Sequence, residues 1–178
     1  MNASEVAEVE AIGAIAVLIG SVALIALRVG GDRFTELRAK LEPWLVPSAA
    51  VVAIVATLGS LWFSEVAHFP PCKLCWYQRI AMYPLALILT IAAVRRDASI
   101  RLYALVLASA GLAVNVWHLY VETFPDRSPG GCDPTNPCTI RWVEALGFWT
   151  IPRLAFAAFV WIIVSLALSP TRKEPHAR

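Results

Sequence analysis

The chain is patterned as long apolar runs separated by short polar connections. The runs are continuous and nearly free of charge, and they occupy residues 11–29, 46–66, 80–94, 102–121 and 150–168. A helix needs about 20 apolar residues to cross a hydrocarbon layer of about 30 Å. A β-barrel would instead show shorter segments of alternating polarity. The pattern therefore predicts an all-α integral membrane protein with five transmembrane helices.

Composition supports a membrane location and argues against nucleic-acid binding. Of the 178 residues, 58% are hydrophobic and 16% are charged, and the mean hydropathy is +0.65. These values are unusual for a soluble domain. The formal net charge is only +2, and the basic residues are scattered rather than gathered into one stripe. We therefore expect a single polytopic membrane domain.

The positions of the basic residues predict how the helices are oriented, because lysine and arginine concentrate in cytoplasmic connections. If the N-terminus is outside, ten of the fifteen fall in cytoplasmic segments: Arg28, Arg33, Arg38, Lys40, Arg95, Arg96, Arg101, Arg172, Lys173 and Arg178. The other five fall outside: Lys73, Arg79, Arg127, Arg141 and Arg153. We therefore predict an outside N-terminus.

The first apolar run is expected to be retained as a helix. It follows Glu5, Glu8 and Glu10, whereas a signal peptide begins with a positive region. Gly13 and Gly20 suit a packing face, since membrane helix interfaces favour small residues. We divide the chain into an N-terminal helix with a basic cytoplasmic loop (1–45), a four-helix membrane domain (46–170) and a cytoplasmic tail (171–178).

All four cysteines fall on the side predicted to be outside. Cys72 and Cys75 stand before the third run, and Cys132 and Cys138 stand in the long connection between the fourth and fifth runs. Disulfides persist in the periplasm or at a cell surface and are rare in the cytosol. The two pairs are therefore candidates for redox-active or structural disulfides.

The first pair has C-x-x-C spacing at the start of a predicted helix, directly after Pro70 and Pro71. Exposed amides and the helix dipole favour a thiolate at such a position. Arg79 follows Cys75 by one helical turn and shares its face. Its guanidinium could stabilise a thiolate or hydrogen-bond a quinone carbonyl. The alternative is that Arg79 only reaches toward lipid head groups.

The second pair lies in residues 128–138, which are rich in turn formers and predict a mobile outer loop. A pair at this spacing could be a structural disulfide that orders the loop. A flexible exposed pair opposite a membrane-bound C-x-x-C also suits a relay, in which a thiolate attacks a disulfide and two electrons pass inward.

Two stretches resemble the DsbB-type thiol:quinone oxidoreductases, especially the branch called BdbC-like in Gram-positive bacteria. The first is Pro71-Cys72-Lys73-Leu74-Cys75-Trp76-Tyr77-Gln78-Arg79 with Met82-Tyr83-Pro84, and the second is Cys138 followed by Arg141, Glu144, Gly147-Phe148 and Thr150-Ile151-Pro152. The resemblance covers about residues 47–168. It implies a four-helix transmembrane bundle of the DsbB type in a bacterial inner membrane, preceded here by one extra N-terminal transmembrane helix.

The resemblance also implies a role for each sulfur. A reduced thioredoxin-like (DsbA-like) dithiol oxidase would attack the Cys132–Cys138 disulfide, with Cys132 forming the mixed disulfide. Cys138 would then exchange with Cys72, and Cys75 would face the quinone with the help of Arg79. Electrons would leave as quinol, formed from either ubiquinone or menaquinone.

The histidines leave several interpretations open. His118, near the outer end of the fourth run, could line a quinone pocket, and both His68 and His118 could ligate metal or haem. Either could equally be a hydrogen-bonded residue at the membrane interface. No C-x-x-C-H is present, so c-type haem attachment is unsupported. We therefore assign catalytic roles to the four cysteines, quinone binding to Arg79 and His118, and no metal ligand.

The same sequence features also allow other classes of protein. The four outer cysteines could together hold one structural zinc ion. A transporter or channel subunit is disfavoured because the predicted helices carry no internal acid or base. Vitamin K epoxide reductase-like enzymes place the loop pair before the C-x-x-C, the reverse of the order here.

Residues 140–149 predict a short helix lying in the membrane interface. Ile140, Val143 and residues 146–148 could then face lipid, while Arg141 and Glu144 face water. The alternative is a cap packed on the bundle.

Overall fold

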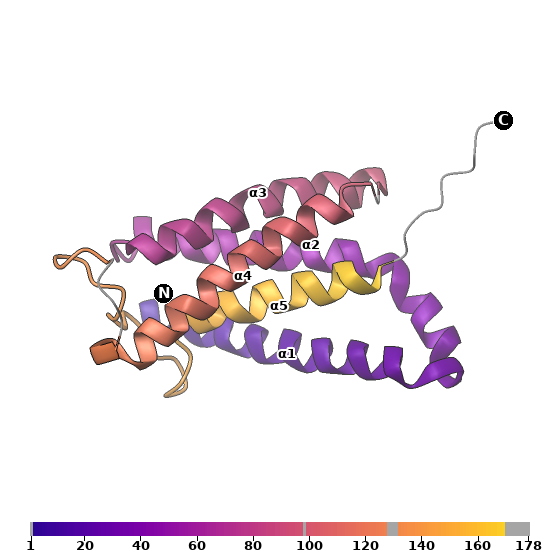
Figure 1. Cartoon of the computed structure of the whole chain (residues 1–178), viewed down its shortest axis with the longest axis horizontal. Helices are drawn as coiled ribbons and strands as arrows, with labels where there is room; N and C mark the ends of the chain where they lie inside the picture. Colours follow the sequence, from indigo (N-terminus) through magenta and orange to yellow (C-terminus); the bar gives the residue numbers. More distant parts are fainter. Residues whose placement is uncertain (1, 98, 128–131, 170–178) are drawn as a thin grey trace.

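The computed structural model of the chain describes all residues except 1, 98, 128–131 and 170–178. It is a bundle of long helices (Figure 1): α1 (Ala3–Val29), α2 (Thr35–Glu65), α3 (Lys73–Arg95), α4 (Arg101–Thr123) and α5 (Ile151–Leu168), with short 3-10 turns η1 (Gly31–Phe34) and η2 (Pro125–Arg127). Each of the five is long and apolar enough to span a membrane. The predicted all-α membrane fold is confirmed. The tail at residues 171–178 lies outside the described residues.

Several helices extend well beyond their apolar runs. α1 begins at Ala3, where the Glu5 carboxylate accepts a hydrogen bond from the Asn2 backbone N–H at 2.9 Å, which caps the helix end. α2 begins at Thr35, within the expected cytoplasmic loop, because residues 36–41 are good helix formers. Acids therefore fall inside the helices, among them Glu10 in α1 and Glu122 in α4. The expectation that the helices carry no internal acid is wrong.

The core lies between α2, α3, α4 and α5, and small residues bring these helices together. Buried Ala49, Ala53, Ala104 and Ala108 pack with the large side chains of Leu85, Leu89, Phe159, Ile162 and Leu166. At Gly111 a β-carbon would overlap the Phe159 ring. Close approach of this kind is how membrane helices associate, because lipid provides no hydrophobic drive between them.

Helix α1 packs chiefly along α5 (Figure 1). Its buried residues Ala7, Ala11 and Ala14 form the contact face. Gly20 lies directly against the Trp161 ring, as expected for a packing glycine. Gly13 has no such neighbour within 4 Å, so the prediction that both glycines serve packing holds only for Gly20.

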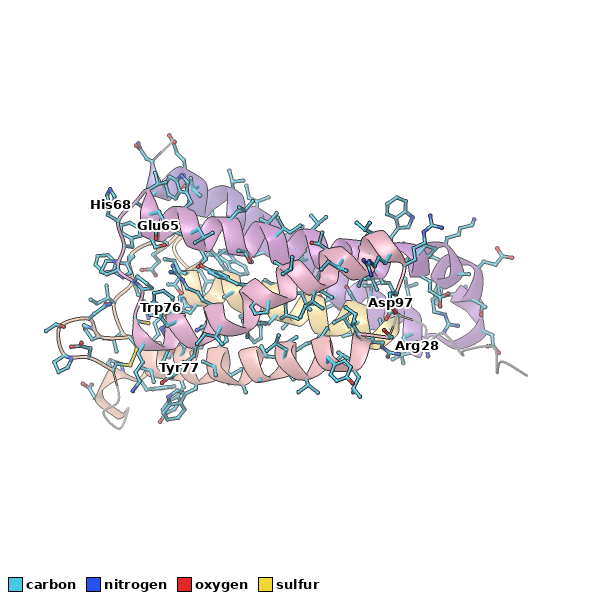
Figure 2. All side chains as sticks on the ribbon, turned by 90° about the horizontal axis from the view of Figure 1, so that it is seen from above. Arg28, Glu65, His68, Trp76, Tyr77 and Asp97 are labelled. Carbon is cyan, nitrogen blue, oxygen red and sulfur yellow. A yellow bond between two sulfur atoms is a disulfide. The ribbon has the colours of Figure 1, made fainter. Side chains whose placement is uncertain are left out.

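The helices place the cysteines and most of the basic residues at opposite ends of the bundle. Figure 2 shows Glu65, His68, Trp76 and Tyr77 at one end, which holds the C-x-x-C, and Arg28 at the other. The two ends thus differ as the predicted topology requires. That the cysteine end faces outward stays a prediction from the charge count.

Residues 140–149 contain no helix, so the prediction of an interfacial helix is wrong. Ala145 and Trp149 instead form an antiparallel bridge, with N···O distances of 2.9 and 2.8 Å. The turn between them places Leu146 at φ 52° and Gly147 at φ 69°, a left-handed conformation that a right-handed helix cannot contain. Val143 is buried. The segment is the packed cap that the alternative described.

Candidate active site

Cys72 and Cys75 form a thiol pair at the first turn of α3. Cys72 is the N-cap residue, and its Sγ accepts a hydrogen bond from the Cys75 backbone N–H at 3.2 Å. The two sulfur atoms lie 2.8 Å apart, and both cysteines are free thiols in this structure. Proximity to the helix N-terminus and to an amide donor favours negative charge on Cys72.

The pKa of Cys72, which precedes the membrane-spanning helix, lies well below the ordinary thiol value of 9.0. The main cause is the neighbouring Cys75 side chain, which hydrogen-bonds the ionised sulfur. Burial opposes ionisation, and a hydrogen bond from His118 favours it. Cys72 is therefore the more readily ionised thiol of the pair, and the thiolate is the reactive form of a cysteine.

A chain of side-chain hydrogen bonds determines how His118 faces Cys72. Asn115 Nδ2 donates to the Pro152 carbonyl and to Gln78 Oε1, both at 2.9 Å. Gln78 therefore points its amide nitrogen at His118 Nδ1, at 2.8 Å. An amide nitrogen only donates, so Nδ1 accepts and the ring proton is on Nε2. That N–H lies 3.7 Å from Cys72 Sγ and 3.1 Å from the Cys138 carbonyl oxygen.

The second cysteine pair is a disulfide docked against the first pair. Cys132 and Cys138 are bonded to each other. Cys138 is buried beside Cys72 in one cluster, and Cys132 is half-buried at its edge. The Asn136 side chain donates to the Pro71 carbonyl oxygen at 3.2 Å. The part of the predicted mobile loop at residues 128–131 lies outside the described residues.

Arg79 is turned into the bundle. Its Nε donates to Ser60 Oγ at 3.0 Å and its Nη2 donates to the Ser60 carbonyl at 2.9 Å. The guanidinium carbon also lies 5.3 Å from the centre of the Trp76 ring. These contacts hold the charge against α2, so the interpretation in which Arg79 only reaches toward head groups does not describe its position.

Beside Arg79 lies a largely apolar cavity of about 410 Å³. Its wall includes Cys75, His118 and Arg79. Much of the rest is aliphatic or aromatic and includes Val51, Val55, Phe63, Phe69, Met82, Tyr83, Trp142 and Phe159. A cavity with an apolar lining and a few convergent polar groups is typical of a small-molecule site.

Glu122 ties the outer connection to the bundle. Its buried carboxylate lies 3.3 Å from both Arg141 Nε and Arg153 Nη2. It also accepts a hydrogen bond from the Thr150 hydroxyl at 2.9 Å. The cluster joins α4, the start of α5 and the connection between them, and so keeps Cys138 near Cys72. Arg141 is thus paired with a buried acid, while its own side chain stays exposed to solvent.

The structure brings five of the six predicted site residues into one neighbourhood, Cys72, Cys75, Arg79, His118 and Cys138, with Cys132 at its edge. His68, an alternative ligand, is exposed and lies outside the cavity wall. Sequence reasoning missed Gln78, Asn115 and Glu122. A polar residue within an apolar run, as Asn115 is, was the available clue, because such residues are costly in lipid.

The zinc hypothesis fits this arrangement poorly. The Cys132–Cys138 disulfide removes two of the four thiolates that it needs. Among the described residues, Cys72, Cys75 and His118 bring their ligand atoms within 4.8 Å of one another. Structural zinc sites take four protein ligands, whereas this group offers three, which are hydrogen-bonded to one another and to Gln78.

Comparison with known proteins places the chain in a family. The family described as "Disulfide bond formation protein DsbB" matches residues 42–169. "Disulfide bond formation protein C" of Bacillus subtilis (strain 168) is 44% identical over 125 residues, which cover 70% of this chain and 91% of that protein. "Probable disulfide formation protein C 2" of Bacillus anthracis is 40% identical over 136 residues, 76% of this chain and 97% of that protein.

A third relative, "Probable disulfide formation protein C" of Halalkalibacterium halodurans, is 44% identical over 117 residues, 64% of this chain and 84% of that protein. No solved structure gives a significant match. Helix α1 precedes the residues that the family matches. The paired thiols, the docked disulfide and the family match agree, and the chain belongs to the DsbB family of disulfide-generating membrane oxidoreductases.

Proposed function

We propose that this protein reoxidises a thioredoxin-like (DsbA-like) dithiol oxidase outside the cell membrane and passes the electrons to a quinone. The position of Cys75 carries the proposal. Its sulfur lies 2.8 Å from Cys72 Sγ, and its side chain also lines the apolar cavity. Cys75 therefore joins the thiol chemistry at the end of the bundle to a site that can hold an apolar electron acceptor.

The first step takes place at the Cys132–Cys138 disulfide. A thiolate of the partner attacks Cys132, which is more accessible than the buried Cys138. The Cys132–Cys138 bond breaks, a mixed disulfide with the partner forms, and Cys138 leaves as a thiolate. The second partner thiol then attacks the mixed disulfide, which leaves the partner oxidised and Cys132 and Cys138 reduced.

The second step moves two electrons to the C-x-x-C. Cys138 attacks the Cys72–Cys75 disulfide at Cys72, since Cys138 and Cys72 share one buried cluster. Cys132 then closes its bond to Cys138, and Cys72 and Cys75 are left as thiols. The bonded outer pair and the free inner pair match the distribution expected at the end of this step, which supports the proposed order. The lowered pKa of Cys72 makes it a good leaving thiolate.

The third step restores the Cys72–Cys75 bond. A quinone bound in the cavity would take two electrons from the pair, one proton from the Cys75 thiol and one from water, since the low pKa of Cys72 leaves that sulfur ionised. Arg79 stands on the cavity wall one turn after Cys75, where its fixed charge stabilises negative charge that develops on a quinone oxygen. His118 lies on the same wall and holds its N–H toward Cys72. Either ubiquinone or menaquinone fits this chemistry.

The sidedness of the protein follows from the same proposal. The partner acts outside the cell membrane, so the cysteine end of the bundle faces outward and the basic end faces the cytoplasm, as the positive-inside rule predicts. Five spanning helices then place the N-terminus outside and the C-terminus inside. The electron path runs from the outer face to a cavity between the helices.

Quinone reduction by the purified protein in detergent tests the function. A reduced DsbA-like oxidase is supplied with a short-chain ubiquinone or menaquinone, and quinol formation is followed for the wild type and for Cys75→Ser. We expect turnover for the wild type and none for the variant. His68→Ala is the control, because His68 is exposed and outside the cavity wall. Wild-type protein that reduces neither quinone would contradict the proposal.

A further inference from the structure

Helix α1 contributes an acidic side chain to the cavity. Glu10 lies on α1 five residues after Glu5, and its side chain is part of the cavity wall with Cys75 and Arg79. The family match begins at residue 42. Glu10 therefore belongs to a helix outside the matched residues.

The carboxylate of Glu10 occupies a defined place against α2. It lies over Gly59, where a β-carbon would overlap its oxygen atoms. The next residue of α2, Ser60, holds the guanidinium of Arg79 through two hydrogen bonds. Glu10 from α1 and Arg79 from α3 therefore reach the cavity beside two adjacent residues of α2, Gly59 and Ser60.

Glu10 has no partner that would explain its position. Among the described residues it forms no ion pair and no hydrogen bond. The charged group of Arg79 is engaged by Ser60 instead. An acid within a membrane-spanning helix is costly unless it is paired or used. A structural role in the bundle would call for a charged partner, as Glu122 has in Arg141 and Arg153.

We propose that Glu10 is a catalytic proton donor to the quinone. The inference rests on the proposed function. With Cys72 ionised, oxidation of the Cys72–Cys75 pair releases two electrons and one proton, whereas reduction of a quinone to a quinol consumes two electrons and two protons. The Glu10 O–H bond breaks as an O–H bond forms on one ring oxygen. The carboxylate then takes up the Cys75 thiol proton, and the other ring oxygen takes its proton from water, which leaves one hydroxide in place of the Cys72 thiolate charge.

Arg79 and Glu10 would have different roles at the cavity. Arg79 keeps a permanent charge and stabilises an oxygen anion, but it cannot supply a proton at physiological pH. A carboxylic acid can give a proton and regain it in each turnover. Helix α1 thus adds to the cavity a group that can transfer a proton, which Arg79 cannot do.

Three variants of the full chain test the proposal, with Glu8→Gln as the matched control on the exposed side of α1. Glu10→Gln keeps the shape and a hydrogen-bond donor but has no transferable proton, whereas Glu10→Asp keeps the acid. Because general acids contribute about 10²–10⁴-fold, we expect kcat for quinone reduction to fall at least about tenfold in Glu10→Gln. It should fall less in Glu10→Asp and stay unchanged in Glu8→Gln.

Gly59→Ala is the third variant. It keeps Glu10 in the chain, but the added β-carbon occupies the position of the Glu10 carboxylate, so kcat should fall in this variant as well. A single-turnover reaction of the reduced partner with the Cys132–Cys138 disulfide, without quinone, should be unaffected in every variant and reports correct folding. Infrared difference spectra provide a readout besides turnover. The carboxylic acid band that changes on addition of quinone should vanish in Glu10→Gln and persist in Glu8→Gln.

The outcomes separate this proposal from the proposed function. Wild-type kcat in Glu10→Gln or in Gly59→Ala overturns the role of Glu10 and leaves the electron path intact. A raised KM with unchanged kcat in Glu10→Gln shows that Glu10 only positions the quinone, and this also overturns proton donation. Absence of quinone reduction in the wild type defeats the proposed function itself.

Discussion

Replacing His118 with alanine should raise the pKa of Cys72 by about one pH unit. A hydrogen bond to a charged group contributes about 1.5–3 kcal/mol, and 1.36 kcal/mol corresponds to one pH unit. The lower end applies here, because Nε2 lies 3.7 Å from Cys72 Sγ and its proton is shared with the Cys138 carbonyl oxygen at 3.1 Å. The neighbouring Cys75 thiol remains as the main stabilising group.

The sign of the pH dependence follows from the lowered pKa. The Cys72 thiolate persists as the pH falls below 9.0, the ordinary thiol pKa. It is protonated only when the pH passes its own lower value. In His118→Ala that transition should move toward alkaline pH, while still lying below 9.0. The rate at which Cys72 reacts as a thiolate should change with pH in the same way.

The ultraviolet absorbance of the thiolate measures this titration without requiring a reagent to reach a buried sulfur. The Cys132→Ser, Cys138→Ser background leaves two thiols, and spectra are taken against the same protein with Cys72→Ser. His68→Ala serves as the control, because that histidine is exposed. An unperturbed Cys72 titrating near 9.0 in the wild type, or the same midpoint with and without His118, would refute the reasoning.

Three further variants test other parts of the site. Cys132→Ser should stop reaction with the reduced partner while the Cys72–Cys75 pair can still be oxidised by quinone, and unimpaired partner oxidation would disprove the relay. Arg79→Gln should raise the apparent KM for quinone about tenfold, the effect of losing one charge-assisted contact of about 1.5 kcal/mol, with the partner half-reaction unchanged. An unchanged KM would limit Arg79 to its structural contact with Ser60. Glu122→Gln should lower the free energy of unfolding in detergent by about 1–3 kcal/mol, since its side chain is 1% exposed and pairs with two arginines. Glu144→Gln, a partly exposed neighbour of Arg141 at 3.8 Å, should have almost no effect.

Sequence alone was sufficient for the membrane fold. The apolar runs predict five helices because lipid satisfies no backbone hydrogen bonds, so length and hydropathy leave few alternatives. The C-x-x-C and the outer pair likewise point to redox chemistry, since cysteine spacing is a local property. The helix ends were less predictable, because capping at Asn2 and helix-forming residues after Thr35 extend α1 and α2 past their apolar runs.

The tertiary structure alone decided which polar groups meet. Asn115, Gln78 and His118 come from α3 and α4, and their order of donors and acceptors is set by the Pro152 carbonyl at the start of α5. Glu10 reaches the cavity only because α2 has a glycine where the carboxylate lies. Hydropathy measures how each residue transfers from water to lipid, and it carries no information about which side chains face each other across a bundle. Those pairings depend on helix rotation and register, which packing determines.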